Sequence, residues 1–311
     1  MASKSGLPSG PRPSHDACVE ISVLVSDWQG HRLLDSGDGA KLEEVGGVRL
    51  IRSEPKAWWS RSLPAAEWQR AAAEHEEGGR EGRWRLKGAC PKEWETRYGD
   101  LRLTLRFMDN SKQFGVFAEQ SPHWEWLARQ RPAPGQRPRL LNLFGYTGAA
   151  SLVAAKAGWS VTHVDASKPA VAWGRRNQEL SGMAEAPIRW IIEDAPTFVR
   201  REVKRGNKYE AVLLDPPAFG RGPGGEFWKV ERDLAPLLRA CRELLSPEAR
   251  FVILTVYTID ASSILCRNLL EDMTRGLRGR VDIGELALKQ ESGGRLLPLS
   301  LWGRWQSGGA A

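Results

Sequence analysis

Short apolar segments alternate with longer amphipathic segments from residue 139 onward. The apolar segments are rich in Val, Ile and Leu and predict strands at 139–144, 161–164, 188–192, 211–214 and 251–256. The segments between and after them predict helices at 147–157, 168–181, 195–205, 229–245 and 261–276. Two final strands are expected at 281–290 and 297–305. Because strands that alternate with helices form a parallel sheet covered on both faces, this region is expected to have an α/β fold.

The chain before residue 131 has a different, β-rich pattern. Leu101, Leu103 and Leu105 alternate with polar residues and predict a half-buried strand. Other strands are expected at 23–25, 45–51, 83–87 and 115–117, and helices at 56–73 and 122–128. Residues 131–138 contain three prolines, which stiffen the backbone and donate no hydrogen bond, and so predict a linker. The expected organisation is a disordered tail at 1–17, a β-rich domain at 18–130 and a second domain at 139–311.

The charge of the chain is concentrated in the second of these domains. The net charge is +7. Residues 136–311 hold 25 basic and 19 acidic residues, whereas residues 1–135 are nearly balanced, with 20 basic and 19 acidic. A positive field favours a polyanionic substrate such as RNA. A surplus of this size is equally compatible with a charge that only keeps the protein in solution.

The sequence gives no sign of a membrane span, a metal site or a disulfide framework. It has no apolar run of about 18 residues and no apolar signal-peptide core. The four cysteines, at 18, 90, 241 and 266, form no Cys-x-x-Cys pair, which fits a reducing cytoplasm. Residues 1–15 contain two basic and no acidic residues, so a transit peptide is conceivable there, although a disordered tail is preferred.

A glycine turn follows the first predicted strand of the α/β region. It reads Asn142-Leu143-Phe144-Gly145-Tyr146-Thr147-Gly148 and leads into a predicted helix. Glycine permits a close approach of backbone and ligand, and the start of a helix offers free N–H groups to an anion. The alternative is that the two glycines only make the turn.

Acidic residues follow the next two strands. Asp165 lies 20 residues after Gly145, a spacing at which a carboxylate can accept hydrogen bonds from both ribose hydroxyls. The alternative role for Asp165, capping the next helix, is better served by Ser167. Glu193 and Asp194 are placed to meet the exocyclic amine of an adenine, and Asp194 is equally suited to cap the helix that begins at 195.

The most specific pattern is Asp215-Pro216-Pro217 after the apolar strand at 211–214. Two successive prolines keep nearby carbonyl groups out of a helix, so these groups are expected to face the cleft beside the Asp215 carboxylate. Acceptors placed in this way can hold the amino group of a nucleobase while its nitrogen attacks a methyl donor. The alternative is a stiff exit from the strand with a capping aspartate.

These motifs together resemble the class I S-adenosylmethionine (SAM) dependent methyltransferases, and more narrowly the bacterial 23S rRNA methyltransferases related to the large-subunit cytosine-C5 and guanine-N7 enzymes. The resemblance covers about residues 136–305, with a looser match at 114–120, a strip expected near the cofactor. It implies a Rossmann-like, seven-stranded class I methyltransferase sheet beside the smaller N-terminal β-rich (α+β) domain. The implied cofactor is SAM, held by Phe144, Gly145, Tyr146, Thr147, Gly148, Asp165, Ala166, Ser167, Asp194 and Asp215.

One departure from that family bears on the reaction. Cytosine-C5 enzymes use a cysteine after the fifth strand of the sheet, and Tyr257 stands at that position here. A tyrosine does not replace a thiolate nucleophile, and Cys241 and Cys266 fall within predicted helices. Transfer to a base nitrogen of rRNA is therefore preferred. Transfer of the methyl group to a protein or a small molecule remains an alternative. Two other classes of protein also remain alternatives: an NAD-dependent oxidoreductase and a non-catalytic RNA-binding module.

The residues after Asp215 are expected to bind the substrate. The catalytic candidates are Asp215, Pro216, Pro217 and Phe219, with Phe219 stacking on the target base. Trp228 is a second candidate for stacking, Arg221 and Lys229 are candidates for phosphate contacts, and the Gly-rich loop at 220–225 is a candidate lid. Ordinary surface chemistry is an equal alternative for the loop. Four N-terminal tryptophans, Trp84, Trp94, Trp124 and Trp126, are expected to be core residues rather than an RNA-stacking surface.

Overall fold

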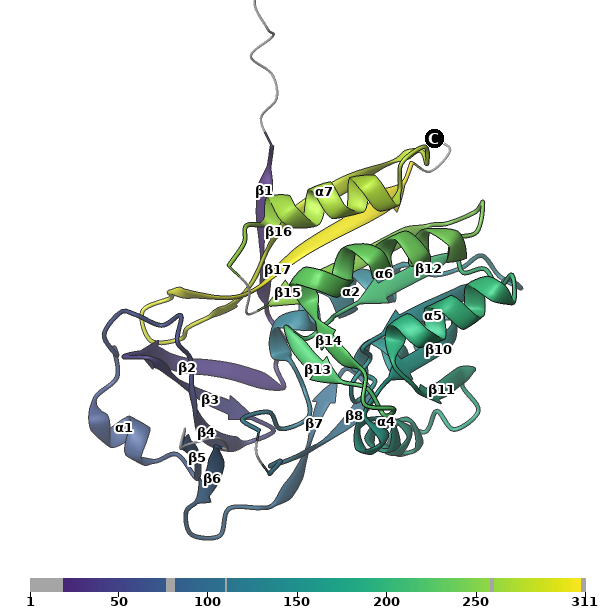
Figure 1. The fold of residues 1–311 in the computed structure, drawn as a ribbon. Coiled ribbons are helices and arrows are strands. Elements are labelled where there is room, and N and C mark those ends of the chain that lie inside the picture. The colour runs from purple at the N-terminus through teal and green to yellow at the C-terminus, as the bar shows by residue number, and fades with distance from the viewer. Residues whose placement is uncertain (1–18, 77–81, 110, 258–259, 309–311) are drawn as a thin grey trace, which may run out of the picture.

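An eight-stranded sheet organises the larger part of the molecule (Figure 1). The structure is a computed structural model that describes residues 19–76, 82–109, 111–257 and 260–308. The expected tail at 1–17 and Cys18 lie outside the described residues. Five neighbouring strands run parallel in the order β11 (Ile188–Ile192), β10 (Ser160–Asp165), β9 (Arg139–Leu143), β12 (Ala211–Leu214) and β15 (Phe251–Tyr257). Their carboxyl ends therefore meet at one edge of the sheet, where ligands bind in folds of this kind.

Three more strands complete the sheet beyond β15. β17 (Leu296–Ser307) and β16 (Gly279–Lys289) are antiparallel neighbours, as expected for the last two strands of a class I sheet. The eighth strand is β1 (Ile21–Ser26), which pairs in parallel with β16. The sequence predicted a strand at 23–25 but did not predict that it joins this sheet. β1 approaches so closely that a Cβ on Gly284 would lie 1.7 Å from the Ser22 carbonyl oxygen, so glycine is required there.

Helices cover both faces of the large sheet. Alternate strand residues enter two separate cores, since Leu140 and Leu213 belong to one and Leu141 and Leu214 to the other. Contacts and shared core residues place α2 (Ser121–Arg129), α3 (Ala149–Ala157) and α4 (Lys168–Leu180) on the first face. They place α5 (Ala195–Lys204), α6 (Val230–Leu244) and α7 (Ser263–Met273) on the second. The predicted fold class is confirmed.

The N-terminal strands form a second, smaller group. A five-stranded sheet has the order β2 (His31–Gly37), β3 (Ala40–Val45), β4 (Val48–Ser53), β5 (Ala73–Glu76) and β6 (Arg83–Leu86). A separate hairpin is formed by β7 (Glu93–Tyr98) and β8 (Leu101–Arg106). The tryptophans of this region have core contacts: Trp124 is buried, and the indole N–H groups of Trp84 and Trp94 donate to the carbonyl oxygens of Ser111 and Val45.

Three local predictions in the N-terminal region were wrong. The expected helix at 56–73 is reduced to α1 (Ala65–Gln69), since residues 56–64 form turns and loop and Ala73 belongs to β5. The expected strand at 45–51 is divided by Gly46 and Gly47, whose positive φ angles make the turn between β3 and β4. The expected strand at 115–117 is a loop that leads into η1 (Ala118–Gln120), a 3-10 turn.

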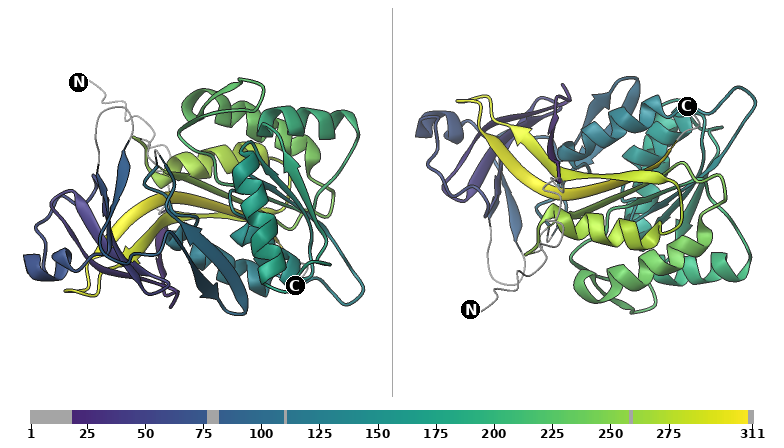
Figure 2. Two further views of the ribbon diagram at one scale, coloured as in Figure 1. Left: turned by 90° about the horizontal axis from the view of Figure 1, so that it is seen from below. Right: turned by 90° about the horizontal axis from the view of Figure 1, so that it is seen from above.

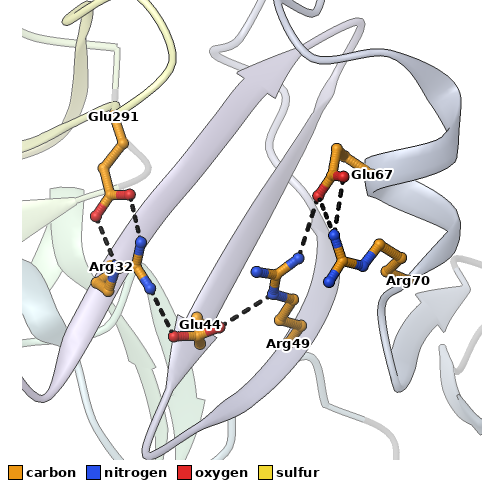
Figure 3. Close-up of polar contacts among 6 residues, drawn as sticks. All are labelled: Arg32, Glu44, Arg49, Glu67, Arg70 and Glu291. Atoms are coloured by element: carbon orange, nitrogen blue, oxygen red, sulfur yellow. Dashed lines mark hydrogen bonds and ion pairs between the residues drawn. The ribbon is translucent and has the colours of Figure 1, made fainter.

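Backbone and side-chain contacts join the two groups of strands. Figure 2 shows the long strands β16 and β17 reaching toward the N-terminal sheet, and Leu33 forms a bridge with Gln290 beyond the end of β16. Figure 3 shows a chain of ion pairs that continues this connection across β2, β3, β4 and α1, through Glu291, Arg32, Glu44, Arg49, Glu67 and Arg70. Partly exposed pairs of this kind each add little stability. In this chain of pairs, the contact of Arg32 with Glu291 is the one that links the two groups of strands.

The predicted linker at 131–138 joins α2 to β9. Two elements from before this linker, β1 and α2, nevertheless pack with the part after it, since β1 extends the large sheet and α2 lies against α3. The division into domains at this position stays a prediction, and a separate N-terminal unit would have to exclude both elements. Within the described residues, no helix has the length and apolar character needed to cross a membrane.

Candidate active site

Two adjoining cavities open at the carboxyl ends of the parallel strands. Cavity I, of about 630 Å³, lies between the glycine turn and α2, and its wall includes Gln120, His123, Gly145 and Thr255. Cavity II, of about 1020 Å³, is lined by Asp165, Ala166, Ser167, Glu193, Asp194 and Arg221, among others. Phe117, Phe144, Tyr146 and Asp215 line both cavities. The residues predicted at four different strand ends thus meet around one continuous site.

The glycine turn is held in an unusual backbone conformation. Phe144 and Tyr146 have φ angles of 58° and 51°, in the left-handed region that non-glycine residues seldom occupy. The Tyr146 N–H donates to Asp165 Oδ2 at 2.8 Å, and the Gly145 N–H donates to the Val164 carbonyl at 3.1 Å. Backbone strain of this kind persists where surrounding contacts impose it and is frequent at functional sites.

Packing explains both glycines of the turn. A Cβ on Gly145 would lie 2.4 Å from Cε1 of the buried His163, and a Cβ on Gly148 would lie 2.7 Å from the Trp190 ring. The side chains behind the turn thus exclude a Cβ at both positions. The close approach of this backbone to a ligand stays a prediction.

We expect Gly145→Ala to destabilise the protein by about 1–3 kcal/mol, because the new methyl group would overlap the His163 ring in a filled core. Urea unfolding would measure the loss. The double variant Gly145→Ala/His163→Ala would be less destabilised than the sum of its two single variants, since removing the ring makes room for the methyl group. Strict additivity would show that the contact with His163 is not the reason for the glycine.

Asp165 and Ser167 divide the two roles that the sequence left open. Ser167 caps α4 by accepting from the Ala170 N–H at 3.3 Å, as expected. Asp165 accepts instead from the N–H groups of Tyr146 and Ser167, each at 2.8 Å, and burial raises the pKa of its carboxyl group. The assignment of Asp165 to a ribose stays a prediction, and its place in the wall of cavity II is compatible with it.

The next strand end shows a capping contact. Asp194 Oδ2 accepts from the Thr197 N–H at 3.0 Å and so caps α5, one of the two roles considered. Asp194 is also part of the wall of cavity II, so the contact with adenine stays a prediction. Glu193 forms an ion pair with Arg201 at 2.5 Å.

Asp215 lies between the two cavities and has two side-chain partners that the sequence did not predict. Thr255 Oγ1 donates to Asp215 Oδ1 at 2.5 Å, and Gln120 Nε2 donates to Asp215 Oδ2 at 3.1 Å. Burial raises the pKa of Asp215 to about 7, with a further contribution from the charge of Glu119, although the Thr255 bond opposes the shift. A carboxyl group with a pKa near neutrality is suited to accept a proton or a hydrogen bond from a substrate.

Two details of the proline corner correct the sequence predictions. The Pro217 carbonyl does not face the cleft unpaired, because the Trp228 indole N–H donates to it at 2.7 Å. Trp228 is only 5% exposed and packs against Phe144, with ring centroids 5.0 Å apart. It therefore forms part of the wall of cavity II and fixes the corner, so a free stacking surface for a base is not available on this ring.

The predicted flexible lid is the tip of a hairpin made by β13 (Phe219–Arg221) and β14 (Phe227–Lys229). Pairing sets Phe219 opposite Lys229 and Arg221 opposite Phe227, so these four side chains share one face while Gly220 and Trp228 share the other. The first face is exposed, with Phe219 at 73% and Phe227 at 53%. The place of Phe227 on this face was not predicted from the sequence. The available signal was its spacing of two residues from Lys229, which matches that of Phe219 from Arg221.

No cysteine described by the structure lines either cavity. Cys241 and Cys266 are buried, and burial raises the pKa of each thiol to about 12. Tyr257 does line cavity II, and burial raises the pKa of its hydroxyl, so this group stays protonated. Among the described residues there is also no cluster of three or more His, Cys, Asp and Glu suited to a metal ion.

Comparisons with known proteins agree with this geometry. The family model described as S-adenosylmethionine-dependent methyltransferase matches residues 69–306. The crystal structure of the SAM-dependent methyltransferase from Agrobacterium tumefaciens is 42% identical, with 96% of this chain and 97% of that chain covered and a TM-score of 0.87. SMU.776, a putative methyltransferase complexed with SAH, shares the fold at 17% identity and a TM-score of 0.69, with 90% of this chain and 76% of that chain covered.

One curated relative has a name that states its substrate. The ribosomal RNA large subunit methyltransferase K/L of Shewanella frigidimarina is 36% identical over 115 residues, which are 36% of this chain and 16% of that protein. The chain thus matches about a sixth of the length of this relative. From the extent of the family match and the near-complete coverage of the Agrobacterium protein, the chain belongs to the family of S-adenosylmethionine-dependent methyltransferases.

Proposed function

We propose that this methyltransferase transfers the methyl group to a base nitrogen of ribosomal RNA. The observation that carries the proposal is the half-buried Asp215 carboxyl group, with a pKa near 7, at the junction of the two cavities and close in sequence to an exposed aromatic and basic hairpin face. The name of the curated relative from Shewanella, a ribosomal RNA methyltransferase, supports the choice of substrate. A substrate of this kind would place the reaction in the cytoplasm.

SAM, the cofactor of the family, supplies a methyl group already activated on its sulfonium sulfur. The task of the protein is therefore to hold and orient the acceptor. Asp215, oriented by Thr255 and Gln120, would accept a hydrogen bond from the target amine and take up its proton. Pro216 and Pro217 would keep this corner stiff, since Pro217 is tied to Trp228. Phe144 to Gly148, Asp165 to Ser167 and Asp194 are proposed to hold the cofactor.

The exposed face of the β13–β14 hairpin is proposed to bind the RNA strand. Phe219 follows the proline corner by two residues and offers its ring to the target base, and Phe227 offers a second ring on the same face. Arg221 and Lys229 lie on that face beside the rings, where they would contact phosphates. Interleaved aromatic and basic side chains are typical of surfaces that bind single-stranded nucleic acid.

The lack of a thiolate supports nitrogen over cytosine C5 as the acceptor atom. Cysteine addition to the ring activates C5, and no described cysteine lines the cavities. An exocyclic or ring nitrogen already carries a lone pair and needs only alignment and removal of its proton. The family match leaves the NAD-dependent oxidoreductase without support.

Mass spectrometry of nucleosides would test the proposal. Ribosomal RNA from a strain lacking the gene is expected to lose one methylated base, and the wild-type gene but not its Asp215→Asn variant is expected to restore it. Purified protein should then transfer tritiated methyl groups from SAM to rRNA of the deletion strain. If neither rRNA nor tRNA changes its methylation, the acceptor is a protein or a small molecule and the proposal is wrong.

The hairpin face gives a separate prediction for substrate affinity. We expect Phe219→Ala and Phe227→Ala each to raise the KM for rRNA of the deletion strain by roughly 5- to 150-fold, the range set by about 1–3 kcal/mol per stacked base. The KM for SAM should not change. Trp58→Ala removes a ring that is 89% exposed in the N-terminal region and serves as the matched control. Equal KM values for the three variants and the wild type would remove the hairpin from the substrate-binding surface.

A further inference from the structure

His123 is a buried polar side chain without a hydrogen-bond partner among the described residues. It lies on α2, is 5% exposed, and neither ring nitrogen is paired. Its ring meets the edge of Trp302 at 5.6 Å between centroids, and the ring also forms part of the wall of cavity I. A buried polar group without a partner is costly, and such groups usually have a ligand or an ordered water as partner.

Other polar side chains of cavity I are already hydrogen-bonded within the protein. Thr147 Oγ1 donates to the Gly115 carbonyl at 2.6 Å, Thr255 donates to Asp215, and Asn142 Nδ2 donates to Ser151 Oγ at 2.9 Å. Of the cavity I residues described by the structure, His123 is the one whose buried polar atoms have no partner. A polar ligand in this cavity could therefore form a hydrogen bond with the unpaired ring nitrogens of His123.

The protonation state of His123 defines what it can bind. Burial and, to a smaller extent, the positive charge of the nearby Arg304 lower the pKa of its imidazole to about 3. The ring is thus neutral at physiological pH, with one nitrogen that donates and one that accepts. Behind it, Trp302 Nε1 and Arg304 Nε are buried donors that also lack partners in the described chain. The surroundings are rich in donors, which favours a ligand that carries an acceptor.

The amino-acid end of SAM fits this requirement. Asp165 and Asp194, the residues expected at the ribose and the adenine, line cavity II, and Asp215, expected at the reaction centre, lines both cavities. An elongated molecule with its adenosine in cavity II and its reacting methyl group near Asp215 leaves its amino-acid end for cavity I. That end carries a carboxylate, which accepts hydrogen bonds, and an ammonium group, which donates them.

We infer that His123 binds the α-amino-acid end of SAM in cavity I. His123 positions the cofactor and takes no part in the transfer of the methyl group or of a proton. His123 was not predicted from the sequence, because a histidine within a Trp-rich helix before the catalytic region belongs to none of the motifs. The inference depends on the cofactor of the family and is independent of whether the acceptor is RNA.

Two ligands that differ only at the amino-acid end would test it by calorimetry of the full chain. S-adenosylhomocysteine carries this end, whereas 5′-methylthioadenosine keeps the adenosine and the sulfur but lacks it. We expect His123→Ala to weaken binding of S-adenosylhomocysteine by about tenfold or more, the effect of losing a hydrogen bond to a charged group. Binding of 5′-methylthioadenosine should stay within twofold. His123→Gln, which keeps a donor and an acceptor, should recover part of the loss.

A control on the same helix separates this role from a structural one. Leu127 is a buried apolar residue of α2 that also lines cavity I, and Leu127→Ala should affect the two ligands equally. Equal losses for both ligands in His123→Ala, or no loss for either, would overturn the inference. If the variants do not fold, ¹⁵N spectra of the histidine rings in the wild type decide: the His123 signals should move with S-adenosylhomocysteine and remain in place with 5′-methylthioadenosine, and equal shifts would contradict the assignment.

Discussion

Asp215→Asn is expected to lower kcat by about 10²- to 10⁴-fold, the usual contribution of a positioned general base. Asparagine has nearly the same shape but cannot take up a proton from the acceptor amine. The affinity for SAM should stay within a few-fold, because the family's ribose and adenine contacts are expected at Asp165 and Asp194. Single-turnover methyl transfer would give the rate, and calorimetry with S-adenosylhomocysteine would give the affinity.

The matched control for this variant is Asp272→Asn, which changes an exposed aspartate of α7 outside both cavities. Its kcat should equal that of the wild type. Full turnover by Asp215→Asn would show that the reaction centre is misplaced. If Asp215→Asn loses both cofactor binding and turnover, Asp215 binds the cofactor, which is the other role suggested by its position between the cavities.

The raised pKa of Asp215 predicts how activity depends on pH. The reaction needs the carboxylate, so kcat should fall about tenfold for each pH unit below about 7, the pKa set by burial. Thr255→Val removes the bond that lowers this pKa, so the fall should begin at a higher pH in that variant. A pH profile that does not move in Thr255→Val would mean that another group controls the rate.

The raised pKa of Asp215 also predicts how the free energy of unfolding changes with pH. The folded-state pKa of about 7 lies above the ordinary value of 3.8, so the native state binds the proton more tightly than the unfolded state. Asp215 therefore lowers the free energy of unfolding as the pH rises from about 4 to about 7. Asp215→Asn should melt at a higher temperature than the wild type at pH 8, with a smaller difference at pH 4.

The sequence predicted the fold from two kinds of local signal. Five apolar strands separated by amphipathic helices define a parallel sheet through periodicity alone, and the structure confirms them. β1 could not be predicted to join that sheet, because its partner β16 lies more than 250 residues away along the chain. The tryptophans at 58, 59 and 68 suggested a long helix at 56–73, but aromatic residues at these positions have no helical period. Residues 56–64 form turns and loop instead.

The candidate site was predicted where the chemistry follows strand ends. Gly145, Asp165 and Asp215 each occupy such an end, and the topology of a parallel sheet brings these ends together. Thr255 and Gln120 were missed because each acts by pairing with Asp215 from another part of the chain, a contact that spacing does not encode. Trp228 was misjudged for a similar reason, since only the pairing of β13 with β14 turns its ring inward.

Asp165→Ala is expected to weaken the binding of SAM and S-adenosylhomocysteine, raising the Kd of each by about 100-fold or more. A carboxylate that accepts from two ribose hydroxyls makes two hydrogen bonds to a charged group, each contributing about 1.5–3 kcal/mol. The variant also loses the bonds to the Tyr146 and Ser167 N–H groups, so part of the effect would come from a looser turn. Calorimetry would measure both ligands, with the exposed Asp100→Ala as a control that should bind normally.

An analogue of S-adenosylhomocysteine without the ribose hydroxyls separates the direct loss from the indirect one. The wild type should bind this analogue much more weakly than the natural compound, because the Asp165 carboxylate would lose the two hydrogen bonds expected from the ribose hydroxyls. Asp165→Ala should bind the two compounds with nearly equal affinity, since it has no carboxylate to lose. If the variant still discriminates between them as strongly as the wild type does, the hydroxyls are recognised elsewhere and Asp165 acts only by holding Tyr146 in the turn.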